Sequence, residues 1–167
     1  MNKLAMKKFG LLLGILAVIS VCAGVLCGCG KDVGTLYRLE EVYASQAIGK
    51  EDLLNIAYHN GDVERNEAEL QNFEPKPIGE LNEKTAQRIR ECVAEVYLKV
   101  NFSEATAENV IIKKYLGCYN GYYAVRFTNN LSGRLDWETD PEDYIEEVGG
   151  IKLSYYRTSF IHLWKEN

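Results

Sequence analysis

The densest group of potentially reactive side chains lies in residues 136–143, where five carboxylic acids surround Trp137. Asp136 and Glu138 flank the tryptophan and form a candidate pair for sugar-bond hydrolysis, in which one carboxyl group donates a proton and the other acts as base or nucleophile. Acidic residues beside an aromatic ring are also common in solvated loops. A hydrolase that uses Asp136, Glu138 and one histidine is kept as the alternative to a non-catalytic function.

The same acidic run partly matches a calcium-binding EF-hand loop. Asp136, Glu138, Asp140 and Glu147 fill the first, third, fifth and last ligand positions of such a loop. The sixth position must be glycine for a sharp turn, and here it is Pro141. The sequence therefore predicts an ordinary solvated loop and no metal site.

The chain has only two histidines, His59 and His162. Nucleophilic catalysis needs a base held against a serine or cysteine, and no Gly-x-Ser-x-Gly elbow or phosphate-binding loop is present. Cysteine and histidine also lack the spacing of a zinc site. The sequence favours a non-catalytic protein with no metal and no cofactor.

Aromatic residues are the second candidate for function, since the chain contains eleven tyrosines and two tryptophans. Tyr115, Tyr119 and Trp164 fall on expected strands, with the two tyrosines on one face of theirs. Tyrosine and tryptophan combine a rigid apolar face with a polar group, which suits recognition of proteins or sugars. These three residues are a candidate binding face, and cross-strand pairing that only stabilises the sheet is the alternative.

The elements that would position these groups begin with a helical hairpin. Thr35 is a suitable N-cap, and apolar residues recur at helical spacing from there to Ala47. Gly49 would end this helix, and the acidic residues after Lys50 suit the start of a second one. Residues 35–61 are therefore expected to form the hairpin.

A polar stretch separates the hairpin from the strongest helical pattern. Residues 62–80 lack periodicity and contain Pro75 and Pro77, so they are expected to be a linker or extended arm. Asn82 is the expected N-cap of a long helix whose apolar face includes Val96 and Val100.

Four strands are expected near residues 110–119, 122–128, 145–156 and 160–165. Asn120-Gly121 favours a two-residue hairpin turn, residues 157–159 would form another turn, and Gly149-Gly150 suggests a bulge inside the third strand. Residues 81–167 would then be one helix plus an antiparallel sheet. The predicted fold is α+β, in the order α-α-α-β-β-β-β, with the helices on one face of a four-stranded antiparallel sheet.

The N-terminus has the features of an export signal. Lysines at positions 3, 7 and 8 precede an uncharged, largely apolar run over residues 9–30. The run ends in Leu26-Cys27-Gly28-Cys29, which resembles a bacterial lipobox. On that resemblance, residues 1–28 are a signal peptide cut after Gly28, Cys29 carries the lipid and residues 29–34 are a tether.

An uncleaved membrane helix is the alternative, because residues 9–30 are long enough to span a hydrocarbon core of roughly 30 Å. Both arrangements place the remaining chain outside the cytoplasmic membrane, since the lysines stay on the cytoplasmic side.

The mature chain would be acidic. Loss of the three signal-peptide lysines lowers the basic count from 19 to 16 against 24 acidic residues, for a net charge of −8. This charge disfavours nucleic acid as a partner. Cys92 and Cys118 would be the remaining cysteines, either as two buried thiols, the favoured case, or as a disulfide.

Four segments give the chain a family resemblance. Residues 36–43, 50–58, 113–121 and Trp164-Lys165 resemble small uncharacterised lipoproteins of gut Firmicutes. The resemblance implies a Gram-positive cell-surface lipoprotein and no particular chemistry. We therefore expect a protein held at the cell membrane through the Cys29 lipid, a non-catalytic binding or accessory module whose partner is an envelope protein or a wall glycan.

Overall fold

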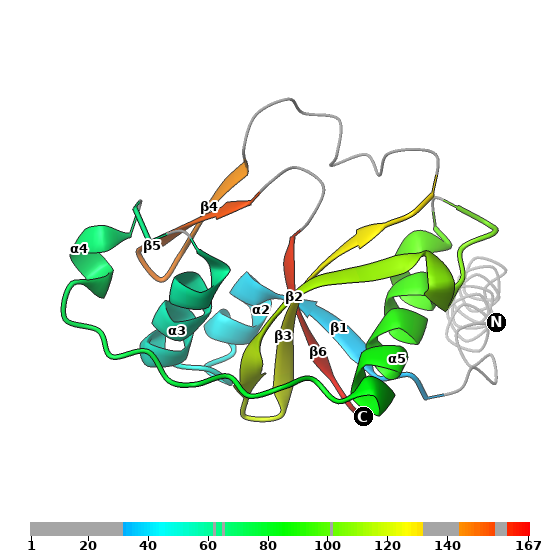
Figure 1. Cartoon of the computed structure of the whole chain (residues 1–167), viewed down its shortest axis with the longest axis horizontal. Coiled ribbons are helices and arrows are strands. Elements are labelled where there is room, and N and C mark those ends of the chain that lie inside the picture. Colours follow the sequence, from blue (N-terminus) through cyan, green and yellow to red (C-terminus); the bar gives the residue numbers. More distant parts are fainter. Residues whose placement is uncertain (1–31, 62, 65, 101, 132–143, 156–159) are drawn as a thin grey trace, which may run out of the picture. The chain divides into compact units, whose positions relative to one another are not determined.

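A four-stranded antiparallel sheet in the order β1-β6-β3-β2 is the centre of the structure (Figure 1). The computed structural model describes residues 32–61, 63–64, 66–100, 102–131, 144–155 and 160–167. The helices are α2 (Leu39–Ala44), α3 (Lys50–Asn60), α4 (Glu67–Leu70), α5 (Glu83–Cys92), the π-helix η1 (Val93–Leu98) and the 3-10 helix η2 (Ala107–Asn109). The strands are β1 (Thr35–Arg38), β2 (Val110–Tyr119), β3 (Tyr122–Asn129), β4 (Tyr144–Val148), β5 (Ile151–Tyr155) and β6 (Ile161–Lys165). The predicted α+β class and four-stranded antiparallel sheet are confirmed.

The first strand of the sheet was not expected. Thr35 was predicted to cap a helix, but residues Thr35–Arg38 form β1, in which Thr35 pairs with Lys165 and Leu36 with Trp164 of β6. The helix starts only at Leu39. The predicted helical hairpin over residues 35–61 is therefore wrong in its first segment, because a strand partner far along the chain outweighs the local helical spacing.

The predicted third strand is also divided differently. Residues Tyr144–Val148 and Ile151–Tyr155 form a separate two-stranded sheet, β4-β5, and Gly149-Gly150 is the turn between its strands rather than a bulge. The fourth strand of the main sheet is instead β1, which lies at the edge beside β6, and β3 pairs directly with β6. The expected turn at residues 157–159 lies outside the described residues.

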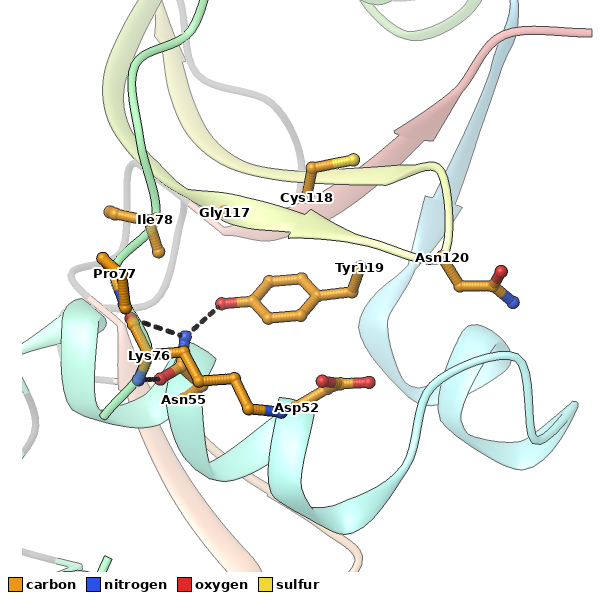
Figure 2. Close-up of a pocket in the computed structure, with 9 residues that line it drawn as sticks. All are labelled: Asp52, Asn55, Lys76, Pro77, Ile78, Gly117, Cys118, Tyr119 and Asn120. Carbon is orange, nitrogen blue, oxygen red and sulfur yellow. Dashed lines mark hydrogen bonds between the residues drawn. The ribbon is translucent and has the colours of Figure 1, made fainter. Parts of the chain in front are cut away.

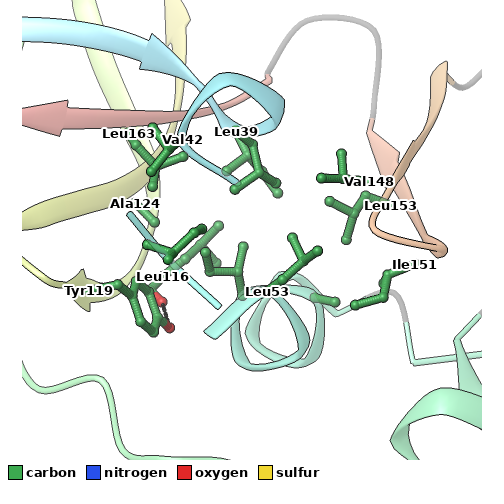
Figure 3. Close-up of a cluster of buried hydrophobic side chains, with 14 residues drawn as sticks. Leu39, Val42, Leu53, Leu116, Tyr119, Ala124, Val148, Ile151, Leu153 and Leu163 are labelled. Atoms are coloured by element: carbon green, nitrogen blue, oxygen red, sulfur yellow. Dashed lines mark hydrogen bonds between the residues drawn. The ribbon is translucent and has the colours of Figure 1, made fainter. Parts of the chain in front are cut away.

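Helices cover both faces of the main sheet, so the prediction that they share one face is wrong (Figure 1). On one face, α2, α3 and the β4-β5 hairpin pack against Leu116, Ala124 and Leu163 (Figure 3). On the other face, α5 and η1 pack against residues such as Val125 and Trp164. A sheet buried on both sides has little free surface for a binding face.

The long helix begins as predicted and then changes its hydrogen-bonding pattern. The Asn82 side chain accepts a hydrogen bond from the Thr85 amide at 2.9 Å, which confirms the N-cap. From Val93 the chain forms a π-helix, which turns Ala94 and Leu98 into the core. The wider turn explains why Val96, expected on the apolar face, is 53% exposed, whereas Val100, at 79%, lies in the turn after the helix ends at Leu98.

The β2-β3 hairpin turns at Asn120-Gly121 as predicted, with positive φ angles of 50° and 81°. Strand β2 has register shifts between Ile112 and Lys114 and between Tyr115 and Gly117. The second shift lies between Tyr115 and Tyr119 and reverses the side-chain alternation there. The two tyrosines therefore face opposite sides of the sheet rather than sharing one.

The predicted arm contains one short helix, α4, followed by extended chain from residue 73 to the start of α5. This extended segment, residues 73–82, is called the arm below. In the parts of the chain that the structure describes, no helix has the length and apolar character needed to span a membrane.

Candidate functional site

An open cleft of about 300 Å³ lies where the arm passes between α3 and the end of β2 (Figure 2). Its walls come from three segments that are distant in the sequence. The lining residues are Asp52 and Asn55 of α3, Lys76, Pro77 and Ile78 of the arm, and Gly117, Cys118, Tyr119 and Asn120 at the β2-β3 turn.

The buried amide of Asn55 holds these three segments together. Its Nδ2 donates to the Tyr119 hydroxyl at 2.8 Å and to the Lys76 carbonyl at 3.3 Å, while its Oδ1 accepts from the Lys76 amide at 2.6 Å (Figure 2). Only 1% of Asn55 is exposed. The Lys76 amide would otherwise need another partner, so the Asn55 side chain constrains where the arm lies.

The wall formed by β2 depends on a close contact at Gly117. This residue has a φ of +115°, and a Cβ atom there would lie 2.6 Å from the Tyr119 hydroxyl and 2.9 Å from Ile78. Glycine therefore permits the tyrosine to fold back and donate to the Leu116 carbonyl at 2.6 Å. Burial raises the pKa of Tyr119, so its hydroxyl stays neutral in this network.

The rim of the cleft carries both signs of charge. The partly buried carboxylate of Asp52 lines one side, and the Lys76 ammonium lies 3.0 Å from Glu51. The hydrogen bond to Glu51 raises the pKa of Lys76, which therefore remains cationic. Because both partners of this ion pair are largely exposed, exchanging Glu51 for a ligand carboxylate costs little free energy.

Cys118 also lines the cleft, but its exposed thiol points away from Asn55 and Tyr119 (Figure 2). The nearby histidine, His59, donates from Nε2 to the Lys76 carbonyl at 2.9 Å, which supports the arm. Among the described residues, no group of three His, Cys, Asp or Glu side chains is arranged to hold a metal ion. The cleft can thus bind a polar molecule through opposite charges and amide groups.

The aromatic face predicted from Tyr115, Tyr119 and Trp164 does not form an exposed surface. Trp164 is 1% exposed and Tyr119 is 7% exposed, on opposite faces of the sheet. Tyr115 is half-buried against Tyr123, and burial raises its pKa to about 12. The physical reason is that helices cover both sheet faces, so the aromatics serve packing, as the alternative interpretation held. Only Tyr119 reaches the cleft.

Trp164 instead fixes the beginning of the domain. Its indole Nε1 donates to the Val33 carbonyl at 2.8 Å, and the Arg88 guanidinium lies 5.5 Å from the centre of its ring. Arg88 also pairs with Glu166. The C-terminal strand therefore holds the segment that leads into β1.

His162 lies in the core rather than on a surface of the sheet. Its ring contacts Tyr97 and Phe127 with centroid distances of 5.0 Å each, and its Nδ1 has no hydrogen-bond partner in the part of the chain that is described. Burial lowers its pKa to about 4. It is therefore a neutral core side chain.

Several sequence-based candidates lie outside the described residues, namely Gly28 and Cys29 of the lipobox and the Asp136 and Glu138 pair. The two remaining cysteines are both free. Cys92 is buried, as expected, and burial raises its pKa to about 11, whereas Cys118 is exposed against expectation.

Sequence reasoning did not identify Asn55 or Lys76 as site residues. A usable signal was present, because Lys76 lies between two prolines, which keep that segment extended and leave its own amide in need of a partner. The partner, a buried asparagine on an otherwise apolar helix face, could not be assigned from the sequence alone.

No protein-family model, curated protein or solved structure matches this chain. The site must therefore be interpreted from its own geometry.

The Asn55 bridge gives a first prediction. Asn55→Ala should make the Lys76 amide hydrogen exchange with solvent much faster and lower the free energy of unfolding by about 1–3 kcal/mol, because buried polar groups lose their partners. Hydrogen-exchange NMR and urea denaturation measure the two effects. Tyr119→Phe is the matched control and should leave the Lys76 amide protected, since Asn55 Oδ1 still accepts from it. Unchanged exchange in Asn55→Ala would mean that the bridge does not hold the arm.

His162 gives a prediction about pH. Between pH 6.5, its ordinary pKa, and about 4, its folded-state pKa, the unfolded chain binds a proton that the folded protein does not. The contribution of His162 to stability should thus be complete above pH 6.5 and fall by about 3 kcal/mol as the pH drops to 4. Urea denaturation across this range should show a smaller decline for His162→Phe and the full decline for His59→Gln. Equal declines in all three proteins would rule out His162 as the cause.

Proposed function

We propose that this protein is a lipid-anchored, extracytoplasmic binding module whose cleft takes a short zwitterionic peptide or a similar small ligand. The observation that carries the proposal is the cleft itself, whose walls are joined to one another by the buried Asn55 network. Pre-ordered walls spare a ligand the entropy cost of ordering them.

The charges of the rim support this ligand class. A ligand ammonium would lie against the Asp52 carboxylate, and a ligand carboxylate would replace Glu51 beside Lys76. The amide of Asn120, whose Nδ2 donates to the Ala47 carbonyl at 3.1 Å, holds the turn at the edge of the cleft. Peptides of the cell wall and of envelope proteins have this chemistry, which agrees with the partners expected from the sequence.

The proposed location at the membrane rests on the N-terminal sequence, which has basic residues, an apolar run and the motif Leu26-Cys27-Gly28-Cys29. Cys29→Ser should abolish incorporation of a fatty-acid analogue and release the protein from the membrane fraction, because a hydroxyl does not replace the acylated thiol. Metabolic labelling and detergent-phase partition measure both effects. Cys27→Ser should behave as wild type. Membrane retention of Cys29→Ser without label would favour the uncleaved helix over residues 9–30.

The ligand proposal is tested with trialanine carrying free termini and with its acetylated, amidated form. We expect the free-terminus peptide to bind at least about tenfold more tightly, a difference of about 1.4 kcal/mol, because only it carries both charges. Calorimetric or NMR titration of the full chain measures the two dissociation constants.

Asp52→Asn should remove most of that preference, whereas Glu108→Gln, a control in η2 next to the far end of β2, should keep it. Equal binding of the two peptides, or binding of neither, would contradict the proposed ligand class.

A further inference from the structure

The segment that leads into β1, residues 33–35, is fixed to the rest of the fold by hydrogen bonds. Val33 is buried, its carbonyl accepts from Trp164 Nε1 at 2.8 Å, and the next carbonyl, that of Gly34, accepts from the Cys92 thiol at 3.5 Å. The Thr35 hydroxyl then donates to the Asn167 side chain at 2.7 Å. The start of β1 is therefore tied to the C-terminal strand and to α5.

Gly34 shows how close this packing is. Its φ is +86°, and a Cβ atom there would lie 2.5 Å from the Lys165 carbonyl oxygen and 2.5 Å from Trp164 Nε1. No larger residue fits without moving the backbone of β6. The segment leading into the domain is thus packed against the fold up to residue 33, and we call Val33, Gly34 and Trp164 the clamp.

The clamp leaves little free chain between the domain and the proposed lipid. Cys29 and Val33 are four residues apart, so even a fully extended chain spans at most about 14 Å. A longer flexible tether would let the domain take any orientation, but a tether of this length holds the clamped end near the lipid.

The cleft lies at the same end of the sheet as the clamp. Thr35 pairs with Lys165, Lys165 pairs with Tyr122, and Tyr122 pairs with Tyr119, so the four residues form one row across the strands. Three strand spacings put Tyr119 about 14 Å from Thr35. The opposite end of β2, at Val110, is about 30 Å away along the strand.

We propose that the clamp and the short tether hold the cleft-bearing end of the domain against the outer surface of the bilayer, so that the cleft binds ligands displayed there. The proposal rests on the lipid anchoring given under the proposed function. It adds the orientation of the domain and identifies the membrane surface as the partner that this end faces.

Cys118 provides the reporter for a test, since it is exposed at the cleft-bearing end of β2 whereas Cys92 is buried. The full lipidated protein is labelled at Cys118 with a donor fluorophore and placed in vesicles of phosphatidylglycerol and phosphatidylethanolamine that contain acceptor-labelled headgroups. The matched sample carries Cys118→Ser with Glu108→Cys, which puts the donor at the opposite end of β2. Energy transfer should be severalfold greater from Cys118 than from the position at residue 108.

A flexible Gly/Ser segment inserted between Gly30 and Lys31 leaves the folded domain unchanged and should reduce the difference between the two positions. Gly34→Ala tests the clamp itself and should have the same effect. Equal transfer from both positions with the native tether, or greater transfer from residue 108, would overturn the proposal. Vesicle flotation of the unlabelled protein reports lipid anchoring separately, so loss of anchoring is distinguishable from a wrong orientation.

Discussion

The position of the arm depends on one buried amide. Asn55 satisfies the amide and carbonyl of Lys76 and the hydroxyl of Tyr119 at once, and these groups belong to the arm and to β2. Without such a partner the Lys76 amide would be left unpaired, and among the described residues only His59 and Glu51 would still hold Lys76 to α3. The cleft exists because α3, the arm and the β2-β3 turn meet at this side chain (Figure 2).

Local sequence patterns predicted correctly those features that depend on a few neighbouring residues. Asn82 caps its helix and Asn120-Gly121 turns its hairpin, because caps and turns depend on a few neighbouring residues. The pairing of Thr35 with Lys165 was missed, since the partners of a strand 130 residues apart leave no local trace. The π-helix after Cys92 was also missed, because the apolar spacing of residues 86–100 fits an ordinary α-helix.

The candidate site was largely missed for the same physical reason. The sequence indicated aromatic residues on strands, but the register shifts in β2 and the helices on both sheet faces bury Trp164 and Tyr119. Tyr119 still belongs to the site, through its hydroxyl rather than through an exposed ring. Asp52 and Lys76 line the same cleft because the arm lies beside α3. The spacing of the two residues in the sequence does not predict this arrangement.

We propose that the cleft beside Asn55 is the ligand-binding site. The most direct measurement is an amide chemical-shift map of the full chain during titration with free-terminus trialanine. If the ligand binds in this cleft, the largest shifts should fall on Asp52, Lys76 and residues 117–120. Shifts concentrated elsewhere, for example around the exposed Val96 and Val100, or no shifts at all, would contradict it.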